Sequence, residues 1–291
     1  MSKQILVLGG TRFFGKRLVN LLLAEGHQIT VGTRGQTAAT FSAPVEWLIL
    51  DRQDKESMAA VLSGRAWDVV YDQICFGPTD AAEALEVFGD RVGKYIFTSS
   101  LAVYDQNKHA GLVEAEFDPA TYPIQMGRVE DWGYAEGKRL AEAVFHQRAP
   151  FPVASVRFPI VFGEDDYTER LLNPVREVVA GRPLQMSAEA HQMCLISSAE
   201  AADFLAWLAT SPLAGSVNAC SNGTITPQAL VGLIEQATGQ TAVVEITAEP
   251  ARFSVVTLHD TWTLDTQLAQ SHGYQFANLG EWLVPLVEHF S

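Results

Sequence analysis

The stretch ILVLGGTRFFGKRLV, residues 5–19, constrains the fold of this chain more than any other. An apolar run meets two glycines, and a helix-like pattern follows. Gly9 permits a tight strand-to-helix reversal, Gly10 keeps the bend unobstructed, and Gly15 permits close packing of the helix on the strand. The start of such a helix favours an anion, because its N–H groups are unpaired and its dipole end is positive. The stretch predicts a dinucleotide-binding turn, with an ordinary turn as the alternative; its candidate cofactor-binding residues are Gly9, Gly10, Thr11, Arg12, Phe13, Phe14 and Gly15.

Strand-like and helix-like segments alternate along the first half of the chain. The predicted strands are apolar runs at residues 5–8, 27–35, 45–51, 67–72, 94–100 and 151–163. Predicted helices lie between them, at residues 14–25, 55–64, 80–90 and 134–149. Alternation at this spacing predicts right-handed crossovers and a parallel sheet that is buried on both faces. The expected fold class is therefore α/β, a Rossmann-type doubly wound parallel sheet.

After Gly163 the pattern changes. Helix-like segments at residues 168–181, 198–209, 226–239 and 278–290 are separated by short strand-like pieces at residues 193–197 and 215–220. The sequence has no linker or internal repeat between the two halves. We therefore expect a dinucleotide-binding domain over residues 1–163 and a smaller lobe over residues 164–291. That lobe is mainly substrate-binding and is interwoven with the first domain.

The charge and the cysteines narrow the class of protein. The formal net charge is −14, and a chain this acidic is poorly suited to bind phosphate backbones, so no nucleic-acid partner is expected. The three cysteines are widely spaced and lack metal-ligand spacing, which predicts a reduced, cytoplasmic setting and no metal site. No signal peptide or segment of membrane-spanning length is recognised, so no membrane partner is expected either.

The second predicted strand bears on which dinucleotide would bind. In NAD sites an acidic residue near the end of this strand holds the ribose 2′-hydroxyl, whereas an arginine accommodates a 2′-phosphate. Here Thr33 and Arg34 occupy that place, and Arg12 lies in the adjacent loop. Two cations without an acid favour NADP over NAD, although solvated arginines are the alternative. Asp51, which ends the third strand, is a candidate for framing the adenine ring.

Tyr134 and Lys138 carry the predicted chemistry. They stand four residues apart in a helix-like segment, so both project from one face. An ammonium beside a phenol favours the phenolate, which makes Tyr134 a candidate acid/base group. The fifth strand ends in Ser99 and Ser100, at the edge where open α/β sheets bind ligands. A serine hydroxyl there could hold a substrate oxygen opposite the tyrosine.

Three motifs, GGTRFFG, FTSSLAVYD and YAEGKRLAE, resemble the extended short-chain dehydrogenase/reductase family, the NAD(P)-dependent epimerases and dehydratases. The resemblance spans nearly the whole chain, since VRFPIVFG and TPQALVGLIEQATG stand where that family has its sixth strand and a late helix. It implies that Ser100, with Ser99 as the second choice, Tyr134 and Lys138 are catalytic. Arg12 replaces the middle glycine of the family pattern. In this the chain is similar to the atypical branch, which includes chloroplast stem-loop RNA-binding relatives.

Departures from the family narrow the expected reaction. Leu101 and Ala102 stand where sugar 4,6-dehydratases carry Asp-Glu, so that elimination is not expected. Ile160 replaces the asparagine of galactose-type epimerases, so a uridine-diphosphate sugar is not implied. The expected reaction is hydride transfer at a hydroxyl or carbonyl carbon of a sugar-like or small carbonyl substrate. Tyr134 would exchange the proton, and Lys138 would bind the nicotinamide ribose.

Two other functions stay open at this point. One is an NADP-binding regulator without turnover, and the other, which the acidic charge disfavours, is an RNA-binding relative. The presence of Ser100, Tyr134 and Lys138 together favours an enzyme, whose small-molecule substrate could carry a phosphate or a nucleotide. The family resemblance further implies a homodimer formed through the Tyr134 helix and the helix before it.

The second half offers further candidates. Arg170, Arg176 and Arg182 could grip a phosphate, although an exposed helix face suits at least two of them. The acidic run at residues 164–166 is expected to form a solvated or substrate-covering loop rather than a metal site. Weaker candidates, for which an ordinary structural role is the preferred interpretation, are Cys75, Asp131, Trp132 and His191.

Overall fold

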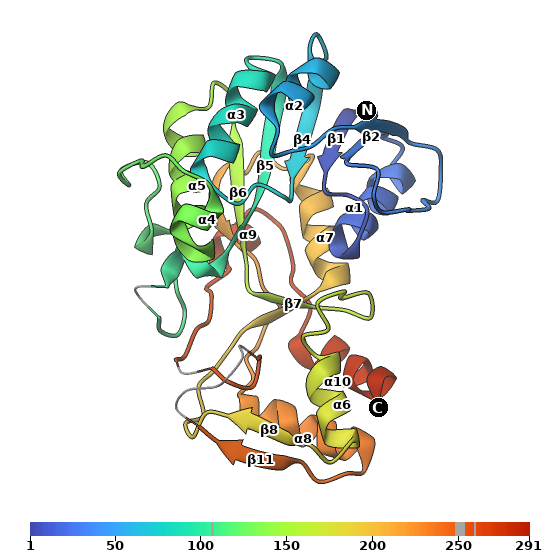
Figure 1. Cartoon of the computed structure of the whole chain (residues 1–291), viewed down its shortest axis with the longest axis vertical. Coiled ribbons are helices and arrows are strands. Elements are labelled where there is room, and N and C mark those ends of the chain that lie inside the picture. Colours follow the sequence, from blue (N-terminus) through green and yellow to red (C-terminus); the bar gives the residue numbers. More distant parts are fainter. Residues whose placement is uncertain (106–107, 248–253, 259) are drawn as a thin grey trace.

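A computed structural model of the chain describes residues 1–105, 108–247, 254–258 and 260–291. Its centre is a seven-stranded sheet in the order β10-β6-β5-β4-β1-β2-β3, in which every neighbouring pair runs parallel (Figure 1). The strands are β1 (Gln4–Leu8), β2 (Gln28–Thr33), β3 (Glu46–Ile49), β4 (Trp67–Asp72), β5 (Val92–Ser100), β6 (Val153–Phe158) and β10 (Gly215–Asn218). The predicted Rossmann-type α/β fold is confirmed.

Helices cover both faces of this sheet. On one face α1 (Phe13–Ala24) packs beside α7 (Ser198–Leu208). On the other face α3 (Pro78–Phe88) contacts both α2 (Lys55–Leu62) and α5 (Tyr134–Arg148). Strand β1 is buried between the two layers: its residues 5 and 7 belong to one core, and residues 6 and 8 to the other. This double burial explains why the strand is a continuous apolar run in the sequence.

A smaller lobe lies below the sheet in the view of Figure 1. It contains α6 (Leu172–Val179), β8 (Pro183–Met186), α8 (Pro227–Thr238), β11 (Val243–Ile246) and α10 (Leu279–Phe290), and β8 pairs with β11 in parallel. The lobe has a hydrophobic core of its own, which includes Leu184, Leu230 and Leu283. An independent core explains how this lobe can form a wall opposite the sheet edge.

The two parts are interwoven along the chain. Strand β10 follows the first lobe elements in sequence, yet it pairs with β6 at one edge of the central sheet. Helices α7 and α9 (Gln267–Ser271) contribute to the core of the sheet, whereas α8 and α10 contribute to that of the lobe. After residue 163 the chain therefore passes repeatedly between the sheet and the lobe.

The single strand predicted over residues 151–163 is wrong. It divides at Pro159 into β6 and β7 (Ile160–Phe162), and β7 leaves the central sheet to pair with β9 (Leu195–Ser197). Proline has no N–H to donate to a neighbouring strand, which accounts for the break. Because of this break, the chain turns away from the sheet just beyond its carboxyl edge and enters the lobe.

Short helical turns complete the described part of the chain. They are η1 (Leu101–Tyr104), which follows β5 directly, η2 (Glu114–Glu116) and α4 (Val129–Trp132). Among the helices of the described residues, none has both the length and the apolar character needed to cross a membrane.

Candidate active site

The glycines at the junction of β1 and α1 are required by the local packing. Gly9 has a φ of +89°, in the left-handed region, and a Cβ there would lie 2.8 Å from Ile74 Cγ2. A Cβ on Gly15 would lie 2.5 Å from both Gly9 O and Gln73 Oε1. Gly15 thus packs against the turn and the loop after β4, not against the strand as predicted. The close approach of helix to strand occurs at Gly10 instead, where a Cβ would meet side chains of both at 3.0 Å.

The two residues that open α1 form part of a cleft wall. Arg12 is the N-cap and has an extended backbone with a φ of −138°. Phe13 has a φ of +51°, which residues other than glycine rarely adopt. The Phe13 ring is buried and makes an edge contact with the ring of Tyr167, at a centroid distance of 6.3 Å. A strained residue therefore stands between the glycine turn and the second half of the chain.

A cavity of about 490 Å³ opens beside the turn, and Arg12, Thr33, Arg34 and Asp51 all line it. Neither arginine has an ion-pair partner in the part of the chain that the structure describes. Asp51 Oδ1 accepts a hydrogen bond from the backbone N–H of Gln53 at 3.0 Å. The two predicted cations therefore border one cavity without a salt bridge, an arrangement that favours a bound anion.

Gln73 and Thr98 also line the cleft and were not singled out from the sequence. Gln73 Nε2 and Thr98 Oγ1 are buried, and neither has a hydrogen-bond partner among the described residues. Buried polar atoms in folded proteins are normally paired, so such groups require a ligand or water. Gln73 directly follows β4 and Thr98 lies near the end of β5, and this position at the carboxyl edge is the one signal in the sequence that points to them.

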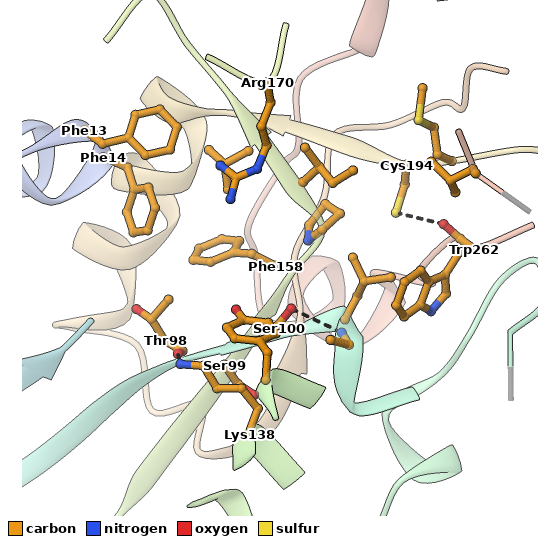
Figure 2. A pocket seen from close by; sticks show the side chains of 18 of the residues that line it. Phe13, Phe14, Thr98, Ser99, Ser100, Lys138, Phe158, Arg170, Cys194 and Trp262 are labelled. Carbon is orange, nitrogen blue, oxygen red and sulfur yellow. Dashed lines mark hydrogen bonds between the residues drawn. The ribbon is translucent and has the colours of Figure 1, made fainter. Parts of the chain in front are cut away.

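A second cavity, of about 560 Å³, lies between the sheet edge and the lobe (Figure 2). Ser100, Tyr134 and Lys138 line it from the sheet side, and Met193 and Trp262 from the lobe side. It shares five lining residues with the first cavity, so the two form one continuous cleft; these are Phe13, Phe14, Gln73, Phe76 and Tyr167.

Lys138 is held rigidly in the floor of this cleft. Its side chain is buried, and Nζ donates hydrogen bonds to Cys75 O at 2.7 Å and to Thr98 O at 2.8 Å. Nζ also lies 4.7 Å from the ring centroids of Phe76 and of Phe97. An ammonium group has three donors, so two backbone carbonyls leave one N–H for a ligand.

Tyr134 begins α5 and lies beside Lys138. Lys138 Nζ is 5.8 Å from the centroid of the Tyr134 ring, and the Phe76 ring is 6.5 Å from it. The Tyr134 side chain is 51% exposed, and its hydroxyl makes no hydrogen bond to any residue that the structure describes. The phenol therefore borders the cavity with its hydroxyl free to meet a ligand.

The two serines at the end of β5 have different roles. Ser99 is buried, and its hydroxyl donates to the carboxylate of Glu142 on α5. Ser100 Oγ accepts the N–H of Ala102 at 3.2 Å and caps η1, which leaves its hydroxyl proton available at the cavity wall. The geometry thus favours Ser100 over Ser99 as the group that meets a substrate.

The acidic loop after β7 contacts the first turns of α1. Asp165 accepts hydrogen bonds from Arg17 Nε and from Ser198 Oγ, both at 2.9 Å, and so ties the loop to α1 and α7. Tyr167 lies over the turn, with Arg12 Cζ 5.5 Å from its ring centroid. We call residues 163–170 the clasp loop. Asp165, Asp166 and Glu169 accept hydrogen bonds from protein donors. No group of three or more potential metal ligands occurs among the described residues.

Of the three arginines in the lobe, one reaches the cleft. The Arg170 side chain points into the cavity in Figure 2, and its Nη1 donates to Thr168 Oγ1 at 2.6 Å. Arg176 and Arg182 form exposed ion pairs with glutamates of the lobe and line neither cavity. Arg176 and Arg182 therefore lie on an exposed surface, as the alternative interpretation expected. Arg170 stays a candidate for binding an anionic group of a ligand.

The weaker candidates have structural surroundings. His191 Nε2 lies 3.3 Å from Glu189 Oε2, and His191 lines neither cavity. Asp131 accepts the backbone N–H of Arg128 at 2.8 Å, as an ordinary helix-entry carboxylate does. Cys75 is fully buried, and burial raises the pKa of its thiol, so it is a packed and unreactive side chain.

The residues of the cleft fit a dinucleotide. Gly9, Thr11 and Arg12 line the cavity at the start of α1, where the unpaired N–H groups and the positive dipole end would hold a phosphate group. The unpaired Gln73 amide and Thr98 hydroxyl would find partners in it, and Lys138 keeps one donor for a ribose hydroxyl. The cleft thus runs from Arg12 and Arg34, which have no ion pair among the described residues, to Ser100 and Tyr134.

Comparison with known proteins identifies a family match in the first part of the chain and similar folds among solved structures. Residues 5–89 match the NAD dependent epimerase/dehydratase family. The fold is similar to that of UDP-glucose 4-epimerase from Thermus thermophilus in complex with NAD, with 21% identity, a TM-score of 0.71 and 98% of each chain covered. It is also similar to UDP-glucose 4-epimerase from Thermotoga maritima with UDP-glucose, with 19% identity, a TM-score of 0.75 and 98% of each chain covered.

One curated relative matches a shorter part of the chain. The chloroplast stem-loop binding protein of 41 kDa b from Arabidopsis thaliana is 36% identical over 116 residues, which make up 35% of this chain. The match spans 30% of that relative's length. The family match is thus confined to residues 5–89, and the solved structures show that the fold is shared over nearly the whole chain.

Proposed function

We propose that this chain is an NAD(P)-dependent oxidoreductase or epimerase that acts at a hydroxyl or carbonyl carbon of a sugar-like or small carbonyl substrate. One observation carries the proposal. Ser100, Tyr134 and Lys138 line one cavity, and that cavity continues into the one bordered by the glycine turn. A regulator without turnover would have no need of a free phenol, a free serine proton and a buried ammonium in the same wall.

Each of the three residues has a distinct role. Ser100 donates its hydroxyl proton to the substrate oxygen and so orients the reacting carbon. Tyr134 takes the hydroxyl proton of the substrate during oxidation and returns it during reduction. Lys138 uses its remaining N–H to hold a ribose hydroxyl. The nicotinamide, when bound, accepts or supplies the hydride at that carbon.

The cofactor that we propose is NADP, with NAD as the alternative. Arg12 and Arg34 line the cavity at the end of β2, where a 2′-phosphate would lie, and neither has an ion pair within the described residues. Solved proteins of similar fold are complexes with NAD, so the preference for the phosphate rests on these two side chains alone.

A titration followed by a turnover assay tests the proposal. Purified protein is titrated with NADPH and NADH by fluorescence, and NADPH is expected to bind more tightly. The cofactor-loaded protein is then assayed on sugar nucleotides, free sugars and small carbonyl compounds, and turnover on at least one class is expected. Cofactor binding without any turnover would favour the regulator. Failure to bind either cofactor, with binding of a stem-loop RNA, would favour the RNA-binding alternative.

A further inference from the structure

A fully buried arginine on β6 bonds side chains of α5, η1 and β10 near the carboxyl edge of the sheet. Arg157, on β6, is 0% exposed. Its Nε and Nη2 donate to the carboxylate of Glu142, with the shortest contact 2.6 Å from Nη2 to Oε2. Its Nη1 donates to the Tyr104 hydroxyl at 2.6 Å, and further donors reach Glu114 O, Phe117 O and Ser216 Oγ. Every nitrogen of the guanidinium therefore has an acceptor.

Glu142 binds a second group that belongs to the site. The hydroxyl of Ser99 donates to its Oε1, and both side chains are buried. The Tyr104 hydroxyl in turn donates to Asn218 Oδ1 at 2.9 Å on β10. We call Ser99, Tyr104, Glu142 and Arg157 the Arg157 cluster. It joins β5, η1, α5 and β6 through buried side chains.

The members of the cluster are direct neighbours of the proposed catalytic residues. Ser99 precedes Ser100 on β5, and Glu142 stands one helical turn beyond Lys138 on α5. Tyr104 ends η1, the turn that Ser100 caps. Movement of the strand end relative to the helix would therefore break bonds of the cluster.

A buried ion pair is not needed for stability alone. Well-packed apolar side chains of similar volume often stabilise a fold as well or better, because burying two charges has a large desolvation cost. A polar network with every donor paired instead favours one arrangement over its neighbours. Burial opposes the charge of Arg157, yet the attraction and hydrogen bonds of Glu142 and Tyr104 outweigh it and raise the pKa of the guanidinium.

We propose that the Arg157 cluster is a positioning unit that holds Ser100 at a fixed distance from Tyr134 and Lys138. The proposal rests on the function proposed above, because it concerns the geometry of that reaction. In this proposal no residue of the cluster contacts the reacting atoms. The cluster affects turnover because it fixes the position of Ser100 and the alignment of α5 against β5.

A pair of matched serine variants tests this role. Ser99→Ala removes one buried hydroxyl that bonds α5 through Glu142, and leaves Glu142 paired with Arg157. Ser155→Ala removes another buried hydroxyl that bonds α5, through His146 at 2.9 Å, away from Ser100. We expect Ser99→Ala to lower kcat about tenfold with KM and the NADPH Kd within about twofold of wild type. Ser155→Ala should shift Tm by a similar amount and leave kcat unchanged.

A third variant separates positioning from direct contact. Ser99 borders the cavity, so a direct role would raise KM as well as lower kcat. Tyr104 does not line that cavity, and Tyr104→Phe removes only the hydroxyl that Arg157 holds. A fall in kcat at constant KM in Tyr104→Phe is therefore expected from a positioning unit alone.

The possible results are distinguishable. One result is that the wild type turns over substrate, while kcat in Ser99→Ala and Tyr104→Phe falls no more than it does in Ser155→Ala. The positioning role is then overturned, and the proposed function stands. If wild-type protein binds cofactor and turns over nothing, the proposed function fails, and the positioning role fails with it. If KM rises in Ser99→Ala while Tyr104→Phe is unaffected, Ser99 meets the substrate directly, and the positioning role is overturned.

Discussion

Two sets of polar side chains lie on either side of the carboxyl edge of the sheet, and they differ in whether their hydrogen bonds are made. In the Arg157 cluster, beneath the edge, each nitrogen of the guanidinium has an acceptor. In the cleft above it, Gln73 Nε2 and Thr98 Oγ1 have no partner among the described residues, and Arg12 and Arg34 have no ion pair there. Since buried polar groups are normally paired, the first set holds the framework and the second awaits a ligand.

The largest expected effect is at the free phenol of the cleft. Tyr134→Phe removes the proposed acid/base group and should lower kcat at least about 100-fold, the usual size of general acid–base catalysis. NADPH affinity, measured by fluorescence, should change less than about twofold. Tyr122→Phe is the matched control, because the Tyr122 hydroxyl is already bonded to Glu136 on the same helix. An equal fall in kcat in Tyr134→Phe and Tyr122→Phe would contradict the assignment of the free Tyr134 hydroxyl as the acid/base group.

The next effect concerns the glycine turn. Gly15→Ala places a Cβ 2.5 Å from Gly9 O and Gln73 Oε1, so the turn must shift. NADPH Kd is expected to rise at least about tenfold, or about 1.4 kcal/mol. Gly232→Ala, in α8, is the control, since its Cβ meets nothing within 4 Å and alanine favours helices. Unchanged affinity in Gly15→Ala would mean that this turn does not hold the cofactor.

A smaller effect is expected at the unpaired cations. Arg34→Ala should raise the NADPH Kd roughly fivefold, or about 1 kcal/mol, and leave the NADH Kd unchanged, because only NADPH carries the 2′-phosphate. Arg176→Ala is the control, since that side chain is paired with Glu169 outside the cleft. Equal weakening of both cofactors in Arg34→Ala would contradict the assignment of a 2′-phosphate site.

The smallest expected effect is on the stability of the fold outside the cleft, and it depends on pH. Burial lowers the pKa of His146 below its ordinary value of about 6.5, so the folded protein keeps the ring neutral where the unfolded chain binds a proton. The unfolded state then binds more protons as the pH falls below that value, and His146 contributes a loss of stability on acidification. In urea melts from pH 7.5 to 5.5, His146→Gln should lose less stability than wild type. Exposed His272→Gln is the control, and an unchanged slope in His146→Gln would contradict this origin.

Much of the fold was predictable because its signals are local. The β1 run, the glycine turn and the α5 spacing of Tyr134 and Lys138 each occupy one short segment, and backbone geometry links sequence to structure there. The sheet order and the return of β10 to its edge depend on pairing between distant segments, which no local pattern encodes.

The site was predictable in part for the same reason. Ser100 and Lys138 are found at a strand end and on a helix face, both of which are visible in the sequence. Gln73, Tyr167 and Glu142 reach the cleft or its framework through contacts with segments far away in the chain. The bond that distinguishes Ser99 from Ser100 joins residues 43 positions apart, so only the folded structure could separate them.

A crystal structure of the protein with NADPH is the most direct test of the account. We predict the pyrophosphate at the turn of residues 9–15, the 2′-phosphate between Arg12 and Arg34, and the nicotinamide ring beside the hydroxyl of Tyr134. NADPH bound elsewhere on the protein, or a cleft still empty at saturating NADPH, would contradict it.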